Sequence, residues 1–321
     1  MTKQYVTILL SGLFSQVAIA QSTQTFEAYS QQIPGTDVSF RMVPIKGGSF
    51  KLGSPDGEKG RNKDEGPARK IELSDFWMGA TEVTFDEYDV FADAEKDKTP
   101  VPDGTTRPSP PYIDLTLGMG KAGGFPANSM SQYAAMKYCQ WLYFKTGIFY
   151  RLPTAAEWEY ACRAGSTTAY PFGEDGAQLK DYAWFSGNSS QKYHKVGQLK
   201  PNAWGLYDML GNVEEWTLDQ YDEKGIANAT EKDPQAIAGT KVSGLLKGGS
   251  FQDDAQLLRS AARIKSDPIW NRRDPQIPKS VWWNADAPFV GFRIVRPAKQ
   301  PGKEEAEKFY NEMIAKYKGA R

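Results

Sequence analysis

Cysteine and histidine are scarce in this sequence, whose 321 residues include two cysteines and one histidine. Two cysteines allow one disulfide at most, so a disulfide-rich fold is excluded. Cys139 and Cys162 are expected to form either that one bond or two buried thiols. We favour the thiols, because nothing in the sequence shows that the two residues meet. A single histidine also leaves a poor ligand set for a transition metal.

Net charge and long apolar runs are lacking as well. Lys plus Arg and Asp plus Glu both number 39, which gives no electrostatic case for binding nucleic acid or an anionic membrane. Beyond the first twenty residues, no segment is apolar enough to span a bilayer. We therefore expect no transmembrane segment in the mature chain.

The first twenty residues are typical of a signal peptide. Lys3 supplies the positive start, residues 6–14 are mostly apolar, and Ala18-Ile19-Ala20 fits the small-x-small cleavage rule. A membrane anchor is the alternative, but the apolar run is well short of the ~20 residues that a span needs. No cysteine directly follows the cleavage point, so we do not expect a lipid anchor there. The mature protein is expected to be exported, and thus periplasmic or secreted.

The remaining composition is that of a folded domain with many turns. Hydrophobic residues make up 40% and aromatic residues 13%, and 30 glycines and 20 prolines indicate little long regular structure. We predict a signal peptide over 1–20, a leader over 21–37, one domain over 38–299 and a C-terminal helical tail over 300–321.

Local patterns predict both strands and helices in that domain. Strands are expected over 38–52, 71–83 and 289–295, and helices over 85–94, 131–146 and 304–318. Thr154 and Glu157 form a capping box that predicts a further helix start. Residues 95–124 and 267–287 are expected to be irregular. Lys46-Gly47-Gly48-Ser49-Phe50 recurs at 247–251, which predicts two similar turn–strand corners.

The stretch 201–216, PNAWGLYDMLGNVEEW, combines carboxylates, glycines and buried apolar residues. Asp208 and Glu215 are hard oxygen donors, and Gly211 allows carbonyl groups to turn inward, as Ca²⁺ sites require. The alternative is a helix start in which Asn212 is the N-cap and Glu215 completes a capping box. On the pattern alone, we favour the helix start.

Seven short motifs occur in order between 38 and 297. They are Met42-Val43-Pro44 with Gly47–Phe50, Thr81–Thr84, Arg151–Thr154 with Glu157–Tyr160, Asn202–Trp216, Lys247–Phe251, Arg259–Arg263 and Gly291–Arg293. In these motifs the chain resembles the formylglycine-generating enzyme family, also called sulfatase-modifying factor domains. The resemblance implies one compact α+β domain with the formylglycine-generating enzyme fold, which is related to the C-type lectin fold and has much irregular backbone.

The resemblance also implies bound calcium, and it makes calcium the favoured interpretation of the 201–216 stretch. The residues that match one family calcium site are Asp208, Gly211, Val213 and Glu215, with the middle two acting through their carbonyls. A second site would begin at Asn188 and Ser189, although the stretch that supplies its carboxylate is shortened here.

The copper chemistry of the family is not expected. Members that oxidise a sulfatase cysteine bind copper through two cysteines just before Ala-Ala-Arg, and soft thiolates are what Cu(I) requires. Here Ser260 precedes Ala261, residues 251–258 hold no cysteine, and Glu214 stands where the family usually has Trp. Cys139 and Cys162 match structural cysteines of some relatives.

Two functions stay open at this point. The first is an exported member that binds a protein or peptide and assists its maturation or assembly. The second is a divergent metal-dependent oxidoreductase or modifying enzyme, with Asp253, Asp254 and His194 as candidate catalytic residues. A Ser-His-Asp hydrolase is not expected, because nothing near His194 resembles a nucleophile elbow.

The expected ligand lining is Trp270, Arg272, Arg273, Trp282, Trp283 and Asp286, with core filling as the alternative role of the tryptophans.

Overall fold

The structure is a computed structural model that describes residues 25–97, 106–108, 111, 113–236, 243–271 and 283–319. The strands are β1 (Tyr29–Gln32), β2 (Ser39–Ile45), β3 (Gly48–Leu52), β4 (Arg69–Leu73), β5 (Phe76–Gly79), β6 (Glu214–Gln220), β7 (Gly244–Lys247), β8 (Ile264–Lys265), β9 (Val290–Gly291) and β10 (Val295–Pro297). The α-helices are α1 (Phe85–Ala92), α2 (Gln132–Thr146), α3 (Ala155–Arg163), α4 (Leu179–Tyr182) and α5 (Lys303–Gly319). Short 3-10 turns are η1 (Lys63–Glu65), η2 (Gly176–Gln178), η3 (Ala255–Leu258) and η4 (Pro268–Asn271).

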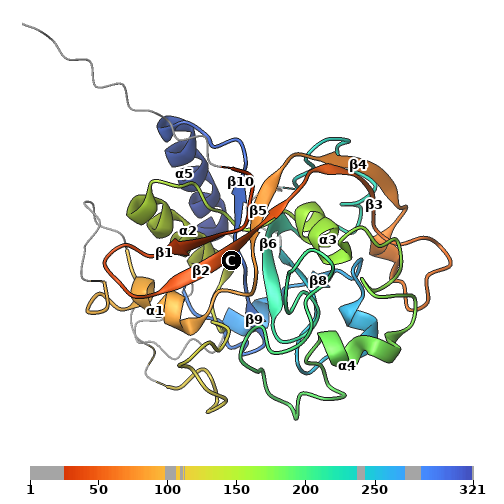
Figure 1. Ribbon diagram of the computed structural model, residues 1–321, viewed down its shortest axis with the longest axis horizontal. Helices are drawn as coiled ribbons and strands as arrows, with labels where there is room; N and C mark the ends of the chain where they lie inside the picture. The colour runs from red at the N-terminus through yellow and green to blue at the C-terminus, as the bar shows by residue number, and fades with distance from the viewer. Residues whose placement is uncertain are drawn as a thin grey trace, which may run out of the picture.

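Within the described ranges, the strands form two four-stranded sheets and one strand pair. One sheet has the order β1-β2-β5-β10 and the other β8-β7-β6-β9, while β3 pairs with β4. Neighbours in the sheets are antiparallel except β6 and β9, which are parallel. Helices α2 and α5 lie together on one side of the domain and α3 on the other (Figure 1). This mixture of helices, short strands and loops in one domain confirms the predicted α+β class.

Burial follows the residue pattern of each strand. Along β2, exposed and buried positions alternate, so that Phe40 and Met42 point inward while Ser39 and Arg41 face solvent. Every residue of β6 is buried, including its polar ones. Because buried polar groups need partners, β6 is where fixed polar contacts are concentrated.

The helix starts agree with their capping signals. Thr154 accepts the N–H of Glu157, and the Glu157 side chain returns a bond to the Thr154 backbone, which confirms the predicted capping box of α3. Thr84 and Glu87 do the same at α1. Helix α2 begins after Ser131, which accepts the N–H of Ala134.

Helix α5 docks on its own domain. Ala306, Tyr310 and Met313 are buried in the same core cluster as residues of α2. The hydroxyl of Tyr317 donates to the carbonyl of Leu218 at 3.0 Å, which ties the helix to β6. The predicted apolar stripe of the tail is thus confirmed as a packing surface.

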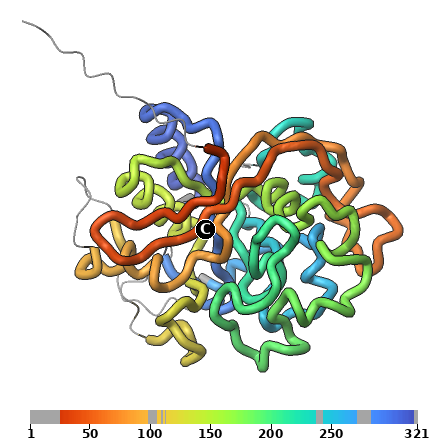
Figure 2. The backbone as a smooth tube through the Cα atoms, viewed as in Figure 1, coloured from red at the N-terminus to blue at the C-terminus, as the bar shows by residue number. Residues whose placement is uncertain are grey.

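Three predictions of local structure are wrong. Part of the 21–37 leader is ordered, because Tyr29–Gln32 form β1 and Ile33 is fully buried (the hairpin at the red end of Figure 2). Residues 71–83 are not one strand, because a turn separates β4 from β5. In that turn the Asp75 carboxylate accepts the N–H of Gly47 at 2.8 Å. The closing strand at 289–295 is likewise split into β9 and β10.

The two Lys-Gly-Gly-Ser-Phe copies do not form similar corners. In the second copy, Gly248 and Gly249 have φ of 96° and 68°, a region that favours glycine, and the motif follows β7. In the first copy, Gly48 begins β3 directly. Identical letters therefore take different backbone forms.

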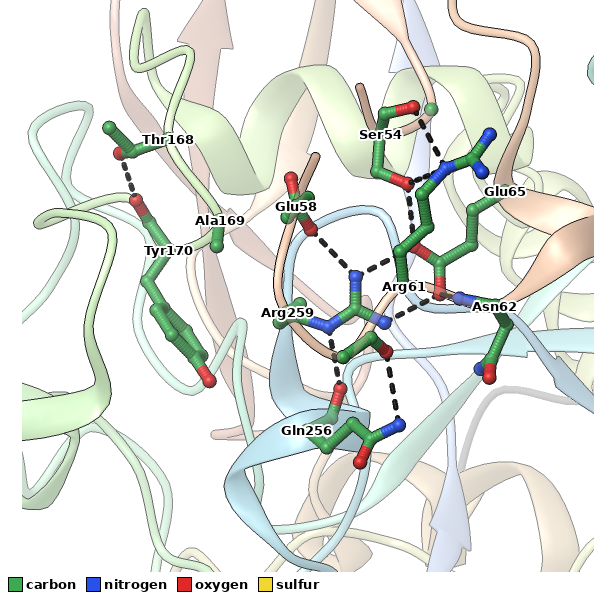
Figure 3. Close-up of polar contacts among 12 residues, drawn as sticks. Ser54, Glu58, Arg61, Asn62, Glu65, Thr168, Ala169, Tyr170, Gln256 and Arg259 are labelled. Atoms are coloured by element: carbon green, nitrogen blue, oxygen red, sulfur yellow. Dashed lines mark hydrogen bonds and ion pairs between the residues drawn. The ribbon is translucent and has the colours of Figure 1, made fainter. Parts of the chain in front are cut away.

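Arg259, from the Arg-Ser-Ala-Ala-Arg motif, fixes the charged loop 54–65 (Figure 3). Its guanidinium donates to Glu58 at 2.6 Å and to the two oxygens of Glu65 at 2.7 and 2.5 Å. Burial opposes ionisation of Glu65, but the hydrogen bonds from Arg259 and Asn62 hold its pKa below the ordinary value. This motif has a structural role.

Both cysteines are buried and free, Cys139 in α2 and Cys162 in α3. Burial raises the pKa of the Cys162 thiol to about 11, and its sulfur lies 3.5 Å from the Ser260 hydroxyl.

Among the described residues, no helix is both long and apolar enough to cross a membrane. The predicted signal peptide, residues 1–20, lies outside the described residues.

Candidate functional site

The stretch 201–216 is a loop that leads into β6, and it is not a helix start. Asp208 and Asn212 have φ of 52° and 57°. The Asn212 side chain accepts the N–H of His194 at 2.8 Å and donates to Glu82 at 3.0 Å. Its amide is used in long-range contacts, and Glu215 already belongs to a strand. The capping-box interpretation of this stretch is therefore wrong.

Glu215 is held by Arg293 at the centre of the domain. The Arg293 Nε lies 2.9 and 2.7 Å from the two Glu215 oxygens, and Nη2 donates to Oε1 at 2.7 Å. Trp158 Nε1 donates to Glu215 Oε2 at 2.8 Å. Both charged side chains are essentially inaccessible. Such a buried, multiply bonded pair fixes β6 against the Gly-Phe-Arg segment.

Among the described residues, the carboxylates of Asp208 and Glu82 beside this pair each have one oxygen without a hydrogen-bond partner. Asp208 Oδ2 accepts the N–H of Gly197 at 2.6 Å, but Asp208 Oδ1 is buried and has no hydrogen-bond partner among the described residues. Glu82 Oε2 is likewise buried and has no hydrogen-bond partner among the described residues. Burial raises the pKa of Asp208 to about 6. Burial, and then the neighbouring Asp208 carboxylate, raise the pKa of Glu82 well above its ordinary value.

This arrangement can hold a proton or a cation between Glu82 and Asp208. Sequence reasoning missed Glu82. Glu82 lies near the end of a segment that is predicted to be a strand. A carboxylate buried there needs a partner, and this requirement was the available signal.

A second carboxyl pair consists of Glu214, the first residue of β6, and Asp253, in the segment that follows β7. Asp253 Oδ2 accepts the N–H and the hydroxyl of Ser250 at 2.8 and 2.6 Å. Glu214 is buried beside it, and its Oε2 has no partner among the described residues. Burial, reinforced by Asp253, raises the pKa of Glu214 well above its ordinary value. Glu214 is thus suited to carry a proton beside Asp253.

The three predicted catalytic residues are not gathered into one metal site. Asp254 accepts the hydroxyl of Ser186 at 2.8 Å. His194 Nε2 lies 2.8 Å from the Ser189 carbonyl, and the ring stacks on Trp184 with centroids 3.8 Å apart. Within the described part of the chain, no three His, Cys, Asp or Glu side chains group as metal ligands.

The predicted ligand lining is only partly at a surface. Trp283 is buried and packs against Tyr133, with ring centroids 5.1 Å apart, so it fills the core. Trp270 packs on Phe289 at 5.4 Å, and its carbonyl accepts the N–H of Asp286 at 2.7 Å. Arg272, Arg273 and Trp282 lie outside the described residues. Core filling, the alternative role, therefore holds for Trp283.

A groove of about 460 Å³ lies beside Asn284, between α1 and the segments 113–116 and 128–130. Its apolar lining includes Phe85, Tyr88, Ile113, Leu115 and Met130. Asp89 pairs with Lys96 and Lys121 at 2.9 and 3.2 Å, so these charges at the groove already have partners. Two further carboxylates of the lining, Asp93 and Asp114, accept backbone N–H groups from Glu95 and Thr116. The groove therefore disfavours an anionic ligand and is suited to a largely uncharged segment.

Asn284 supplies the groove with a buried donor. Residues 283–285 are fixed by the bonds Ser131 N–H to Trp283 O at 3.0 Å and Ala285 N–H to Ser129 O at 2.9 Å. Asn284 lines the groove, and its Nδ2 is buried without a hydrogen-bond partner among the described residues. A ligand carbonyl would remove the cost of that unmade bond. Sequence reasoning singled out Trp283 and Asp286, which flank this position, but it did not single out Asn284 itself.

Residues 31–298 match the model of the sulfatase-modifying factor enzyme 1-like domain. The chain belongs to that family. It is 27% identical over 274 residues to the formylglycine-generating enzyme of Thermomonospora curvata, covering 72% of this chain and 90% of that protein. It is 30% identical over 253 residues to serine/threonine-protein kinase pkn1 of Chlamydia pneumoniae, covering 75% of this chain. The match spans only 38% of the length of that kinase.

A solved structure, PvdO from Pseudomonas aeruginosa, has the same fold. Its TM-score is 0.66 at 27% identity, over 84% of this chain and 98% of that one. The comparison confirms the predicted family fold.

The residues that would hold the calcium of this family fit it only in part. Asp208 Oδ1 is a hard, unpartnered oxygen, and Glu82 Oε2 supplies a second one that the sequence comparison did not include. Glu215 fits poorly, because both of its oxygens are bonded to Arg293. Bound calcium stays a prediction, with Glu82 and Asp208 as its best-placed carboxylates and the carbonyls of Gly211 and Val213 as its expected backbone ligands.

Asn188, the predicted start of a second site, serves a turn. Its Oδ1 accepts the N–H of Phe185 at 2.9 Å, and its Nδ2 donates to the carbonyl of Ala183 at 2.9 Å. The neighbouring Ser189 hydroxyl donates to the Phe251 carbonyl at 2.6 Å. These bonds give both residues a structural role, and a second calcium ion remains a prediction.

Proposed function

We propose that this chain is an exported member of the sulfatase-modifying factor family that binds a peptide segment of a partner protein and assists its maturation or assembly. It would do so without the thiolate copper site. The observation that carries the proposal is the groove with its apolar lining and the buried Asn284 Nδ2, which has no hydrogen-bond partner among the described residues.

The groove chemistry matches a peptide better than a charged metabolite. An extended peptide offers carbonyl acceptors at regular spacing and apolar side chains between them. Asn284 would donate to one such carbonyl, while Phe85, Tyr88 and Met130 would surround a neighbouring apolar side chain. Ile113 lines the groove and is more than half exposed, as expected of a contact residue that awaits a partner.

The absence of a thiolate pair supports binding without copper oxidation. The position before Ala261-Ala262-Arg263 is Ser260, and residues 251–258 contain no cysteine. The two cysteines present are buried in separate core clusters. Export is supported by the signal-like pattern of the first twenty residues.

The Glu214–Asp253 pair favours one alternative. A buried carboxyl group with a raised pKa next to a second carboxyl group is an acid–base arrangement, and the alternative is a divergent metal-dependent oxidoreductase or modifying enzyme that acts on an exported peptide or protein. In this alternative, Asp253 would keep the catalytic role that the sequence suggested for it.

A peptide-display selection tests the proposal. The mature protein would be presented with a library of random twelve-residue peptides, and the affinity of a selected peptide would be measured. Ile113→Asp places a charge in the groove and should weaken binding at least tenfold, whereas Ile269→Asp, at a similarly exposed site outside it, should not. Failure to select any peptide, or equal loss in both variants, would refute groove binding.

Mass spectrometry of the bound peptide separates the two functions. An unchanged peptide mass after incubation with air and added metal supports a binding protein. A mass change that disappears in Asp253→Asn would establish the enzymatic alternative.

A further inference from the structure

A second hollow lies away from the groove, where β2, α3 and the 201–216 loop meet. Its volume is about 510 Å³, and its lining includes Arg41, Pro44, Lys46, Tyr160 and Trp204. None of its lining residues belongs to the groove. Trp204 belongs to the 201–216 stretch and takes no part in the carboxylate contacts described above.

Aromatic rings form one wall of this hollow. Tyr160 and Trp204 meet edge to face with ring centroids 4.9 Å apart, and Phe50, which does not itself line the hollow, packs against Tyr160 with ring centroids 5.1 Å apart. All three are only partly buried. The hydroxyl of Tyr160 donates to the Lys46 carbonyl at 3.0 Å, which fixes the ring in place. The wall is therefore a rigid apolar surface that reaches solvent.

The loop that carries Trp204 is fixed as well. Asn202 Oδ1 accepts the N–H of Trp204 at 3.0 Å, and its Nδ2 donates to the carbonyl of Ala161 at 2.7 Å. Gly205 has a φ of 83° and faces open space. The indole thus sits on an anchored turn, and little order remains to be gained on binding.

The charges at the hollow are positive. Arg41 is exposed on β2, and its guanidinium has no hydrogen bond or ion pair within the described part of the chain. Lys46 is 79% exposed at its side chain and pairs with Asp75 at 2.6 Å. Among the described residues that line the hollow there is no carboxylate. An anionic ligand would meet a free guanidinium without facing a lining carboxylate.

We propose that this hollow binds an acidic sugar residue, a pyranose ring that bears a carboxylate. The C–H bonds on one face of such a ring form a flat apolar surface that can pack on Trp204 and Tyr160. The ring carboxylate would bond to Arg41, whose planar guanidinium matches a carboxylate with two parallel hydrogen bonds. An acidic peptide side chain would satisfy Arg41 but would leave the aromatic wall uncovered, so the sugar acid uses more of the hollow.

Calorimetric titration of the purified mature chain with trigalacturonate, at low and at high salt, tests the site. Neutral galactotriose and the aromatic acid benzoate serve as comparison ligands. Arg41→Gln should weaken trigalacturonate binding about tenfold, because it removes a charge-assisted contact from an exposed position where folding is unaffected. Trp204→Leu should weaken it further. Lys51→Gln, at an exposed lysine on β3 that does not line the hollow, should leave it unchanged.

The proposal stands if trigalacturonate binds, binding falls with salt and Arg41→Gln weakens it while Lys51→Gln does not. It is overturned if trigalacturonate does not bind, if the two variants behave alike, or if galactotriose binds equally well. Equal binding of benzoate would assign the hollow to aromatic acids and would also overturn it. Asn284→Ala, a groove variant, should not alter this binding, so failure here leaves the proposed peptide function independent.

Discussion

Arg293 holds both carboxylate oxygens of Glu215 in the centre of the domain, at distances of 2.7 to 2.9 Å. The same guanidinium donates to the carbonyls of Gly79 and Tyr207 at 3.1 and 2.9 Å. One side chain thus joins β5, β6 and the 201–216 loop. Glu215, one of the two carboxylates that the family resemblance assigns to calcium, is the partner of this buried cation.

Arg293→Gln should lower the free energy of unfolding by about 3–5 kcal/mol, because it leaves the buried Glu215 charge unpaired. Urea denaturation monitored by tryptophan fluorescence measures the change. Lys308→Gln is the control, since its pair with Glu312 is more than half exposed on both sides and should matter by under about 1 kcal/mol. Equal effects of the two substitutions would contradict a central role for Arg293.

Added calcium should raise the midpoint of thermal unfolding, and chelation should lower it. Glu82→Gln and Asp208→Asn should each abolish that shift, because they neutralise the two carboxylates that carry unpartnered oxygens. Asp75→Asn, at a surface ion pair, should retain it. A calcium shift that survives Glu82→Gln would remove Glu82 from the site. Elemental analysis completes the experiment, since stoichiometric copper or iron would instead support the enzymatic alternative.

Glu87 should make the protein less stable as pH rises. Burial raises the pKa of Glu87 from 4.5 to about 7. A folded-state pKa above the unfolded one means that the folded state binds more protons. The stabilising contribution of Glu87 is therefore fully present at a pH below its unfolded-state pKa and is lost as pH rises through its folded-state pKa. The change between these limits is on the order of 3 kcal/mol. In Glu87→Gln, this component of the pH profile of unfolding should vanish, and an unaltered profile would show that Glu87 stays ionised in the fold.

The sequence predicted best what depends on neighbours along the chain. Thr154 and Glu157 lie three positions apart, and their capping box forms as expected. The apolar stripe of α5 could be predicted for the same reason, since helical spacing alone brings Ala306, Tyr310 and Met313 onto one face.

What the sequence could not supply was the pairing of distant segments. Glu82 reaches Asn212 and Asp208, and Glu215 reaches Arg293, only because separate strands and loops pack together. The role of Asn212 shows the consequence. Its local spacing to Glu215 fitted a helix cap, but both side chains bond to residues far away in the sequence, and tertiary contacts overrode the local pattern.

Arg259 should control the rigidity of loop 54–65. Arg259→Met removes the cation that pairs with Glu58 and Glu65 and leaves Glu65 with only the hydrogen bonds from Ser54 and Asn62, which should cost about 3–5 kcal/mol of unfolding free energy. Brief trypsin digestion should then cut first at Lys59, Arg61 or Lys63. Gln256→Ala, which removes one exposed bond to the Gly60 carbonyl, should leave the digestion pattern unchanged. First cleavage elsewhere in the Arg259 variant would show that other contacts fix the loop.

Asn284 offers the sharpest separation of stability from binding. Its buried Nδ2 makes no hydrogen bond within the described chain, so Asn284→Leu should raise the free energy of unfolding by about 1 kcal/mol. The same substitution should abolish binding of a groove-selected peptide, because the donor for its carbonyl is gone. Asn212→Leu is the contrasting variant, since its amide is fully engaged with Glu82 and His194, and it should destabilise the protein by about 3 kcal/mol. If Asn284→Leu lowers stability and leaves peptide affinity intact, Asn284 is a structural residue and the groove must be recognised by other groups. If it raises stability and removes binding, the unmade bond is one that the protein keeps for its ligand.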